Sequence, residues 1–391
     1  MLIETNLDEV KKRESALFFI NEHIQKNGRL NLYDLTGLSG AYLLKKEDFE
    51  VLETYVGPAV FEKMLDEYGK AHLGGEKVLG FNRTSAGILA TILALVKKDS
   101  TVVHYLPELP SHPSIPRSTQ LVGGHYLEFD NLKDFLLPEN TSLVVITGST
   151  MDHKVISEEE FKKIIKKAHL HPSGKIPVLV DDASGARLRP IVFNQPSALD
   201  LGADLVVTST DKLMDGPRGG LMAGKSSLID AIKSKAHQFG LEAQAPLVAG
   251  MVRALEQFNP ENILRSLDKK EKLKKLLNQE FEGFKETPTG VMISPHDIAG
   301  ELEKRNIDTR LSPDDLSFLW AMILLKEYGV ITIPAVGMPG ASPTLRLDMA
   351  SLDGKKLELN EIKNILKGSF KKMEIIAPHI DKSKDILFKN R

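Results

Sequence analysis

The stretch between residues 178 and 225 constrains the fold more than any other part of this chain. One short apolar run, 178–180, ends at Asp181, and a second, 205–207, ends in Thr-Ser-Thr-Asp and then Lys212. Short apolar runs bounded by polar residues and glycine are typical of buried parallel strands. Ligands of open α/β sheets bind outside the carboxyl ends of such strands. We therefore expect Asp181 and Lys212 to reach one crevice, although they are far apart in the sequence.

A carboxylate and a lysine in one crevice suggest pyridoxal phosphate bound as a Schiff base. A lysine forms this bond only as the neutral amine, so its pKa must be lowered by desolvation or by nearby positive charge. Pyridoxal phosphate acts as an electron sink, and an acidic partner keeps its pyridine nitrogen protonated. Lys212 is predicted as the Schiff-base lysine and Asp181 as the partner. Asp182 is the alternative partner, because neighbours on a strand point to opposite faces.

Residues 207–225, VTSTDKLMDGPRGGLMAGK, carry a family resemblance. They resemble the lysine segment of bacterial selenocysteine synthase, the L-seryl-tRNA(Sec) selenium transferase, with its pattern Ser-x-Asp-Lys-Leu-x-Gly-Gly-Pro-x-x-Gly. The chain is also similar to the archaeal group of short selenocysteine-synthase-like pyridoxal phosphate proteins, from about residue 82 to 225 and more loosely at the C-terminus. The resemblance implies the fold-type-I transferase fold, an α/β class with a mostly parallel sheet, helices on both faces and a smaller α+β domain. It also implies the roles given above to Lys212 and Asp181.

Three residues before the expected helix 88–97 form a candidate phosphate site: Arg83, Thr84 and Ser85. Free N–H groups and the dipole at a helix N-terminus favour anions. Simple capping by Thr84 or Ser85 is the alternative. The resemblance implies that this turn holds the cofactor phosphate. Hydroxyl groups beside the lysine, on Thr208, Ser209 and Thr210, are further candidates.

A ring usually stacks on the cofactor in this fold, and the candidates are His104, Tyr105 and His112, with His112 preferred. Ser149 follows the expected strand 142–147 and matches an asparagine of the family pattern. The resemblance implies that Ser149 faces the cofactor hydroxyl oxygen.

Arg346 is the most informative residue of the C-terminal part. It alternates with Leu345 and Leu347 on an expected short strand and so faces the other side. Arginine suits bidentate binding of a carboxylate. We expect Arg346 to bind the substrate carboxylate, and a surface ion pair is the alternative.

The expected domains are an N-terminal segment, 1–45, that packs with the small domain, a large pyridoxal phosphate-binding α/β domain, 46–242, and a linker helix with a small α+β domain, 243–391. Strands and helices alternate from 77 to 225, which indicates a parallel sheet. Residues 243–280 are predicted as one long helix or a broken pair, and 330–334 as a strand.

Composition limits the partners. Lysine and arginine total 51 against 53 acidic residues, a net charge of −2, which argues against a bulk tRNA surface. There is no cysteine, so disulfides, thiolate metal sites and the nucleophile of a cysteine desulfurase are excluded, and no metal is expected. No apolar run has the length of a signal peptide core or of a membrane span. The expected location is the cytoplasm, with no membrane partner.

A competing motif overlaps the lysine segment. Residues 219–226 satisfy the P-loop pattern GxxxxGK[ST]. The interior of this candidate loop, Leu-Met-Ala, suits a strand better than a phosphate-binding turn. The acidic strand also precedes the glycines, where a P-loop protein normally has it afterwards.

The sequence therefore predicts a pyridoxal phosphate-dependent transferase or lyase. The expected reaction is β-elimination or replacement on a small amino acid or its phosphorylated ester, as the resemblance implies. No room is expected for the N-terminal tRNA domain of the bacterial enzyme, so a tRNA substrate is not expected. An aminotransferase and a non-catalytic pyridoxal phosphate-binding protein are the alternatives. At least a homodimer is expected, with Arg218 available to the phosphate pocket.

Overall fold

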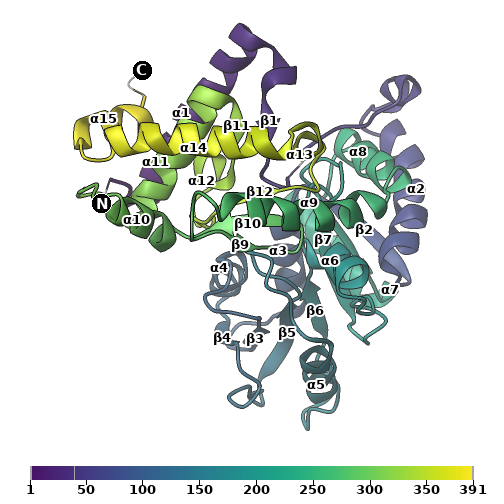
Figure 1. The fold of residues 1–391 in the computed structure, drawn as a ribbon. Helices are drawn as coiled ribbons and strands as arrows, with labels where there is room; N and C mark the ends of the chain where they lie inside the picture. The colour runs from purple at the N-terminus through teal and green to yellow at the C-terminus, as the bar shows by residue number, and fades with distance from the viewer. Residues whose placement is uncertain (1, 39, 390–391) are drawn as a thin grey trace. The chain divides into compact units, whose positions relative to one another are not determined.

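The computed structural model describes residues 2–38 and 40–389, and the chain divides into two compact units (Figure 1). Unit 1 comprises Met1–Leu38 and Glu261–Arg391, and unit 2 comprises Ser39–Pro260. The expected domains differ from these units at two places, because residues 39–45 and 243–260 belong to unit 2. The helix expected as a linker after residue 242 is therefore part of the large unit.

Unit 2 is built on a seven-stranded sheet with the order β2-β8-β7-β6-β5-β3-β4. Only β8 runs antiparallel to its neighbours, and the other pairings are parallel. The mostly parallel sheet is confirmed. The strands are β2 (Lys77–Phe81), β3 (Thr101–Tyr105), β4 (His125–Phe129), β5 (Thr141–Thr147), β6 (Val178–Asp181), β7 (Leu205–Ser209) and β8 (Gly220–Gly224).

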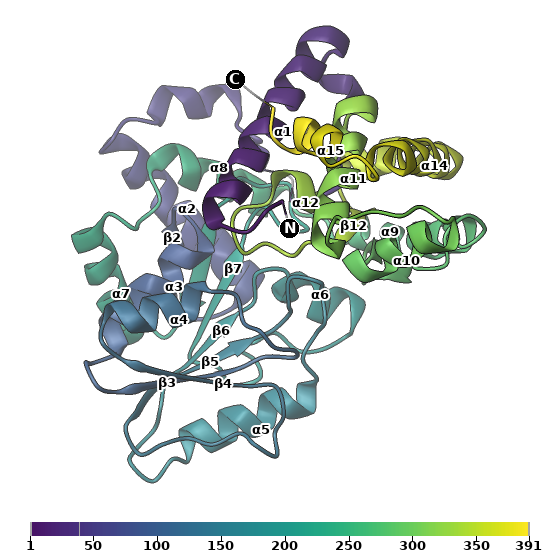
Figure 2. The same cartoon turned by 90° about the vertical axis from the view of Figure 1, so that its left-hand side faces the viewer.

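Helices cover both faces of this sheet, as Figure 2 shows for α5 on one side and α3 and α4 on the other. The helices α2, α5 and α8 pack on the first face, and α3, α4 and α7 pack on the second. Their bounds are α2 (Val56–Leu73), α3 (Thr84–Leu95), α4 (Ser114–Leu121), α5 (Glu158–His169), α6 (Gly185–Val192), α7 (Ser226–Phe239) and α8 (Ala245–Glu256), with the 3₁₀ helix η2 (Lys46–Val51). Helix α5 begins at Ser157, which forms the expected capping box with Glu160.

The alternation of side chains along β6 fixes the geometry at its carboxyl end. Val178 and Val180 belong to the core on the first face, and Leu179 belongs to the core on the second. Since neighbouring side chains on a strand point to opposite faces, Asp181 follows Leu179 to the second face, and Asp182 follows Val180 to the first.

Unit 1 combines helices with two small sheets, β12-β10-β9 and β1-β11. Its largest buried side chain, Trp320, packs among Phe281, Phe284 and Phe370, and donates from Nε1 to Ser369 Oγ at 2.8 Å. The elements are α1 (Asn6–Asn27), η1 (Arg29–Asn31), β1 (Tyr33–Asp34), α9 (Glu261–Leu277), β9 (Lys285–Glu286), β10 (Gly290–Ile293), α10 (Pro295–Lys304), α11 (Pro313–Tyr328), β11 (Val330–Ile331), α12 (Ile333–Val336), β12 (Leu345–Asp348), α13 (Leu352–Lys356), α14 (Leu359–Ile376) and α15 (Ile380–Leu387).

The structure corrects one expected strand and resolves one open choice. The strand expected at 330–334 ends after Ile331, and Pro334 lies in the first turn of α12. Proline has no N–H for a sheet and is favoured at the start of a helix. The region 243–280 forms the broken pair α8 and α9, with the break before Pro260, because the residue before a proline avoids helical geometry.

No helix within the described ranges 2–38 and 40–389 is long and apolar enough to cross a membrane.

Candidate functional site

The strands β6 and β7 bring Asp181 and Lys212 to the same edge of the sheet. The two strands are parallel neighbours, and Asp181 pairs with Val207 in the register. Lys212 lies five residues beyond Val207, past the end of β7. The positive charge of Lys212 acts on Asp181 and favours its ionised form. The expected juxtaposition of this carboxylate and this lysine is present in unit 2.

Asp181 presents a buried acceptor atom. Its Oδ1 is shielded from solvent and has no hydrogen-bond partner, although the residue as a whole keeps some exposed surface. Burial raises the pKa of Asp181 to about 6, against the opposing charge of Lys212 and with help from Asp182. A buried acceptor without a donor is costly to a protein. The atom is suited to a donor supplied by a ligand, and a protonated pyridine nitrogen is one.

Asp182 has a different environment. It is fully buried and forms an ion pair with Arg189, which is also fully buried. Its Oδ1 lies between Gly148 and Gly185, where a Cβ on either glycine would overlap it. Asp182 is therefore engaged by the protein on the first face of the sheet, whereas Asp181 faces the second.

The candidate phosphate residues lie at the start of α3. Arg83 is the N-cap residue and makes no side-chain capping bond. The first amide groups of a helix lack acceptors within the helix. Strand β8 lies directly behind this turn, since a Cβ on Gly220 would come within 2.6 Å of the Arg83 carbonyl oxygen and 2.8 Å of the Thr84 nitrogen. With Arg83, Thr84 and Ser85, this turn offers amide donors, two hydroxyls and a positive charge, which is a donor set suited to a phosphate group.

The three candidates for a ring on the cofactor differ in exposure. His104 is fully buried, and its ring nitrogens lie 2.8 Å from Tyr126 Oη and 2.8 Å from Thr147 Oγ1. Tyr105 is fully buried and donates to Glu160 Oε1 at 2.6 Å. Both rings are thus enclosed by the protein.

His112 is the exposed member of the three. The protein around its ring, with the charges of Lys212, Arg117 and Arg83, lowers its pKa to about 4. Its Nδ1 accepts from the Ser114 amide at 3.3 Å, which leaves the proton of the neutral ring on Nε2. A neutral imidazole in the field of Lys212 and Arg83 is compatible with stacking on an aromatic ligand.

The candidate hydroxyl groups are engaged within the protein. Ser149 Oγ lies 2.8 Å from Ser184 Oγ. Thr210 Oγ1 donates to the Pro217 carbonyl at 2.6 Å, and Ser209 Oγ donates to Asp211 Oδ1. These bonds stabilise the turn between β7 and β8. Cofactor contacts of Ser149, Ser209 and Thr210 stay predictions.

Two buried arginines on α6 were not predicted. Arg187 and Arg189 follow the acidic end of β6 by only a few residues, and both are fully buried. The sequence signal was present, because two arginines that alternate with apolar residues directly after a strand-end Asp pair need acceptors nearby. Arg189 finds Asp182, and Arg187 contacts the lysine segment, residues 208–214.

Arg218 lies in the turn after the lysine segment, where Nε donates to Asp211 Oδ2 at 3.0 Å. Its side chain keeps 43% of its surface exposed. The residue expected to serve the phosphate pocket thus has an acidic neighbour and an accessible guanidinium.

Arg346 lies in unit 1 on β12 and is buried. Its Nη2 donates to the Thr36 carbonyl at 3.0 Å. The expected surface ion pair is not its environment, since only 7% of the residue is exposed. The Coulombic influence of Arg346 favours ionisation of Asp348, against the burial that raises the pKa of that carboxyl.

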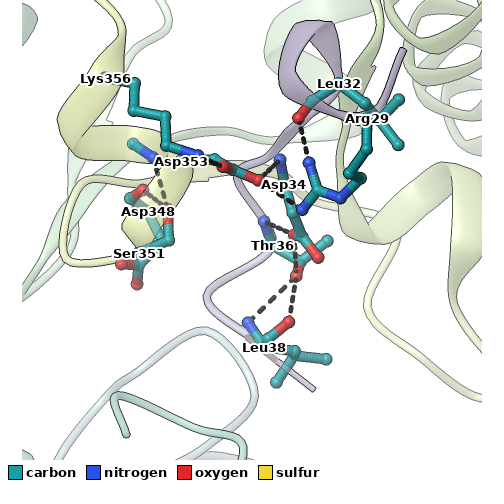
Figure 3. Close-up of polar contacts among 10 residues, drawn as sticks. Arg29, Leu32, Asp34, Thr36, Leu38, Asp348, Ser351, Asp353 and Lys356 are labelled. Carbon is teal, nitrogen blue, oxygen red and sulfur yellow. Dashed lines mark hydrogen bonds and ion pairs between the residues drawn. The ribbon is translucent and has the colours of Figure 1, made fainter. Parts of the chain in front are cut away.

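The Thr36 loop that receives this bond is itself anchored, as Figure 3 shows. Asp353 accepts from Arg29 at 3.0 Å and from the Asp34 amide at 3.0 Å. Asp34 in turn accepts from the Thr36 hydroxyl at 2.5 Å, and burial raises the pKa of Asp34. These contacts fix residues 34–38 against β12 and α13.

The competing P-loop does not form. Residues 220–224 are the buried strand β8, and Lys225 Nζ lies 2.5 Å from Asp204 Oδ1. No glycine loop is left to hold a phosphate there.

A cavity of about 480 Å³ lies beside Asp182 on the first face of the sheet. It is bounded by His72, Asp182, Arg189 and Gln195, among others. Because Asp181 points to the second face, this cavity is separate from the crevice of Asp181 and Lys212. Among the residues that the structure describes, no cluster of three or more side chains suited to a metal is found.

Two family models match parts of the chain. The model described as L-seryl-tRNA selenium transferase matches residues 138–289, and the model of the UPF0425 C-terminal domain matches residues 280–358. The first of these covers Asp181 and the lysine segment.

Solved structures resemble the whole chain in fold. A complex of SepCysS with the N-terminal domain of SepCysE has a TM-score of 0.59 at 16% identity, over 90% of this chain and 98% of that one. The aspartate aminotransferase of Thermotoga maritima has a TM-score of 0.56 at 16% identity, over 93% and 100%. Identities this low show the fold alone, which is that of the fold-type-I pyridoxal phosphate-dependent transferases.

Relatives in two archaea are similar over nearly the full length. A UPF0425 pyridoxal phosphate-dependent protein of Methanothermobacter thermautotrophicus is 52% identical over 95% of each chain. Another from Methanosphaera stadtmanae is 50% identical over 96% of this chain and 97% of its own. The chain belongs to the UPF0425 family of pyridoxal phosphate-dependent proteins, as the fold and the Asp181–Lys212 pair already indicated.

Proposed function

We propose that this protein is a pyridoxal phosphate-dependent enzyme that holds its cofactor covalently through Lys212. The observation that carries the proposal is the buried, unpartnered Oδ1 of Asp181 at the strand end next to the lysine. A protonated pyridine nitrogen would donate to this atom and satisfy it. The ionised carboxylate would then keep the proton on that nitrogen, since the opposite charge stabilises it.

The remaining contacts follow from the donor sets in unit 2. The amides of the α3 N-terminus, with Arg83, Thr84 and Ser85, would bind the phosphate group. His112 would cover one face of the ring. Ser149 would lie near the ring hydroxyl, while Ser209 and Thr210 would hold the turn that carries the lysine.

The proposed reaction is elimination or replacement at the β-carbon of a small amino acid. The bound cofactor supplies an electron sink for charge that develops at the substrate α-carbon. Lys212 Nζ, released when the substrate amine takes its place, would accept the α-proton. Arg346 would bind the substrate carboxylate. The similarity to the selenium transferase model supports this reaction over transamination.

The covalent attachment predicts a specific chemical outcome. Borohydride treatment of the holoprotein should fix the cofactor on Lys212, identified by peptide mass, and Lys212→Ala should abolish both this adduct and the visible absorbance. Lys225→Ala is the matched control and should keep both, because Lys225 pairs with Asp204. An adduct on Lys225, or none on the wild type with added cofactor, would refute the assignment.

The raised pKa of Asp181 predicts a trade between stability and cofactor binding. An unfolded aspartate ionises near 3.8, whereas folding raises this pKa to about 6. Stability is then present at low pH and is lost as the pH rises between these values. We expect Asp181→Asn to stabilise the cofactor-free protein by roughly 2–3 kcal/mol near neutral pH, and by little near pH 4, in urea unfolding.

The same variant should bind pyridoxal phosphate more weakly. Asp182→Asn is the control, and it should instead lose stability at neutral pH, because it leaves the Arg189 charge buried without a partner. Equal stability of wild type and Asp181→Asn near neutral pH, or unchanged cofactor affinity, would count against the proposed role of Asp181.

The reaction itself predicts measurable products. Incubation with L-serine or O-phospho-L-serine should release pyruvate and ammonia in equal amounts, and phosphate as well from the phosphoester. An aminotransferase would form the oxo acid only with an added oxo acid and without free ammonia. If no free amino acid reacts or changes the visible spectrum while a seryl- or phosphoseryl-tRNA does, the proposed substrate class is wrong.

We also propose at least a homodimer, with Arg218 of one subunit near the phosphate group of the other. The exposed guanidinium of Arg218 supports this placement. Sedimentation of the holoprotein should give a dimer or larger assembly, and Arg218→Ala should weaken cofactor binding. A monomer that retains the cofactor stoichiometrically would contradict the proposal.

A further inference from the structure

Arg187 on α6 is a buried cation with an unusual set of acceptors. It is fully buried, yet within residues 2–38 and 40–389 its hydrogen bonds go only to neutral groups. Its Nε has no partner. Burial lowers the pKa of Arg187 to about 10, while the charges of Asp211 and Asp182 oppose this. A guanidinium in such a place is costly, and an apolar side chain of similar volume would suit stability better.

The comparison with Arg189 makes this clearer. Arg189 is two residues further on the same helix and equally buried, and it forms an ion pair with Asp182. A carboxylate partner is thus available in this part of unit 2, but Arg187 points elsewhere. Its placement asks for another explanation than charge pairing.

All but one of the acceptors of Arg187 lie in the lysine segment. Nη1 donates to the Ser209 carbonyl at 2.8 Å, to the Lys212 carbonyl at 3.1 Å and to Thr208 Oγ1 at 3.1 Å. Nη2 points to Met214 Sδ at 3.6 Å. One side chain therefore spans the segment from its first to its last residue, and holds two main-chain carbonyls that no strand pairing fixes at the Lys212 end.

The backbone next to Lys212 needs such a hold. Leu213 has a φ of +56°, in the left-handed region that leucine rarely adopts. Its strained conformation turns the Lys212 peptide so that the Lys212 carbonyl faces Arg187. A residue in this region persists only when its surroundings impose it. The Arg187 bond to this carbonyl is a contact that imposes it.

We infer that Arg187 is a positioning residue for Lys212, fixing the main chain of the lysine segment so that the amine is held at the crevice beside Asp181. The inference rests on the proposed function of Lys212 and adds the group that sets its direction. Arg187 acts through the lysine main chain and does not touch the reacting atoms.

The test replaces Arg187 by Met, which keeps length and packing, and by Lys, which keeps the charge with a different donor geometry. Two readouts are needed. The first is hydrogen–deuterium exchange of peptides that cover residues 208–214 in the cofactor-free protein. The second is the rate of the visible absorbance change on adding pyridoxal phosphate, with the site of borohydride attachment.

We expect Arg187→Met to speed exchange of the lysine segment and to slow attachment at Lys212 roughly tenfold or more, since a misplaced group reacts much more slowly. Arg187→Lys should recover part of both. Arg253→Met is the control, because it breaks a buried ion pair with Asp48 in the same unit, at 2.6 Å, without contacting the lysine segment. It should leave both readouts close to those of the wild type.

The outcomes separate the two proposals. Unchanged exchange at 208–214 and unchanged attachment in Arg187→Met would overturn the inference. If Arg187→Met does not fold, Arg187→Lys decides, and exchange equal to the wild type there would overturn it. If the wild type attaches no cofactor at Lys212 while exchange still rises in the variants, the proposed function fails and the positioning of the segment stands.

Discussion

The division of two adjacent carboxylates between the faces of one sheet underlies the architecture of unit 2. Strand β6 ends in Asp181 and Asp182, and the side-chain alternation of a strand sends them to opposite sides. Asp182 is buried with Arg189 and closed in by Gly148 and Gly185, so it belongs to the framework. Asp181 keeps a buried oxygen without a partner and is left for a ligand.

The lysine segment depends on this framework. It leaves β7 beside β6, makes its turn through bonds of Ser209 and Thr210, and returns as β8. Gly220 in β8 then allows the Arg83–Thr84 peptide to approach closely. The candidate phosphate turn, the lysine and the carboxylate are thus linked through one sheet edge, and a shift of β8 would disturb all three.

Stability and function are opposed at two buried groups of this unit. Asp181 resists ionisation because of its burial, and Arg187 is buried without a carboxylate. Each costs folding free energy that the apolar cores on both faces of the sheet offset. Such groups are most readily explained where a site needs a preorganised charge or a fixed main chain, because local rules of stability are usually broken at functional sites.

The sequence by itself determined the fold class and the central pair. The spacing of apolar runs predicted parallel strands, and strand-end chemistry pointed to Asp181 and Lys212. It could not decide between Asp181 and Asp182, because that depends on which face of β6 meets which helices. Neither could it predict that Thr210 and Ser209 bond within the turn, that His104 is enclosed, or that Arg187 reaches the Lys212 carbonyl. Those contacts join residues whose distance and direction are set only when α6, β7 and the turn pack together, and local patterns carry no information on that packing.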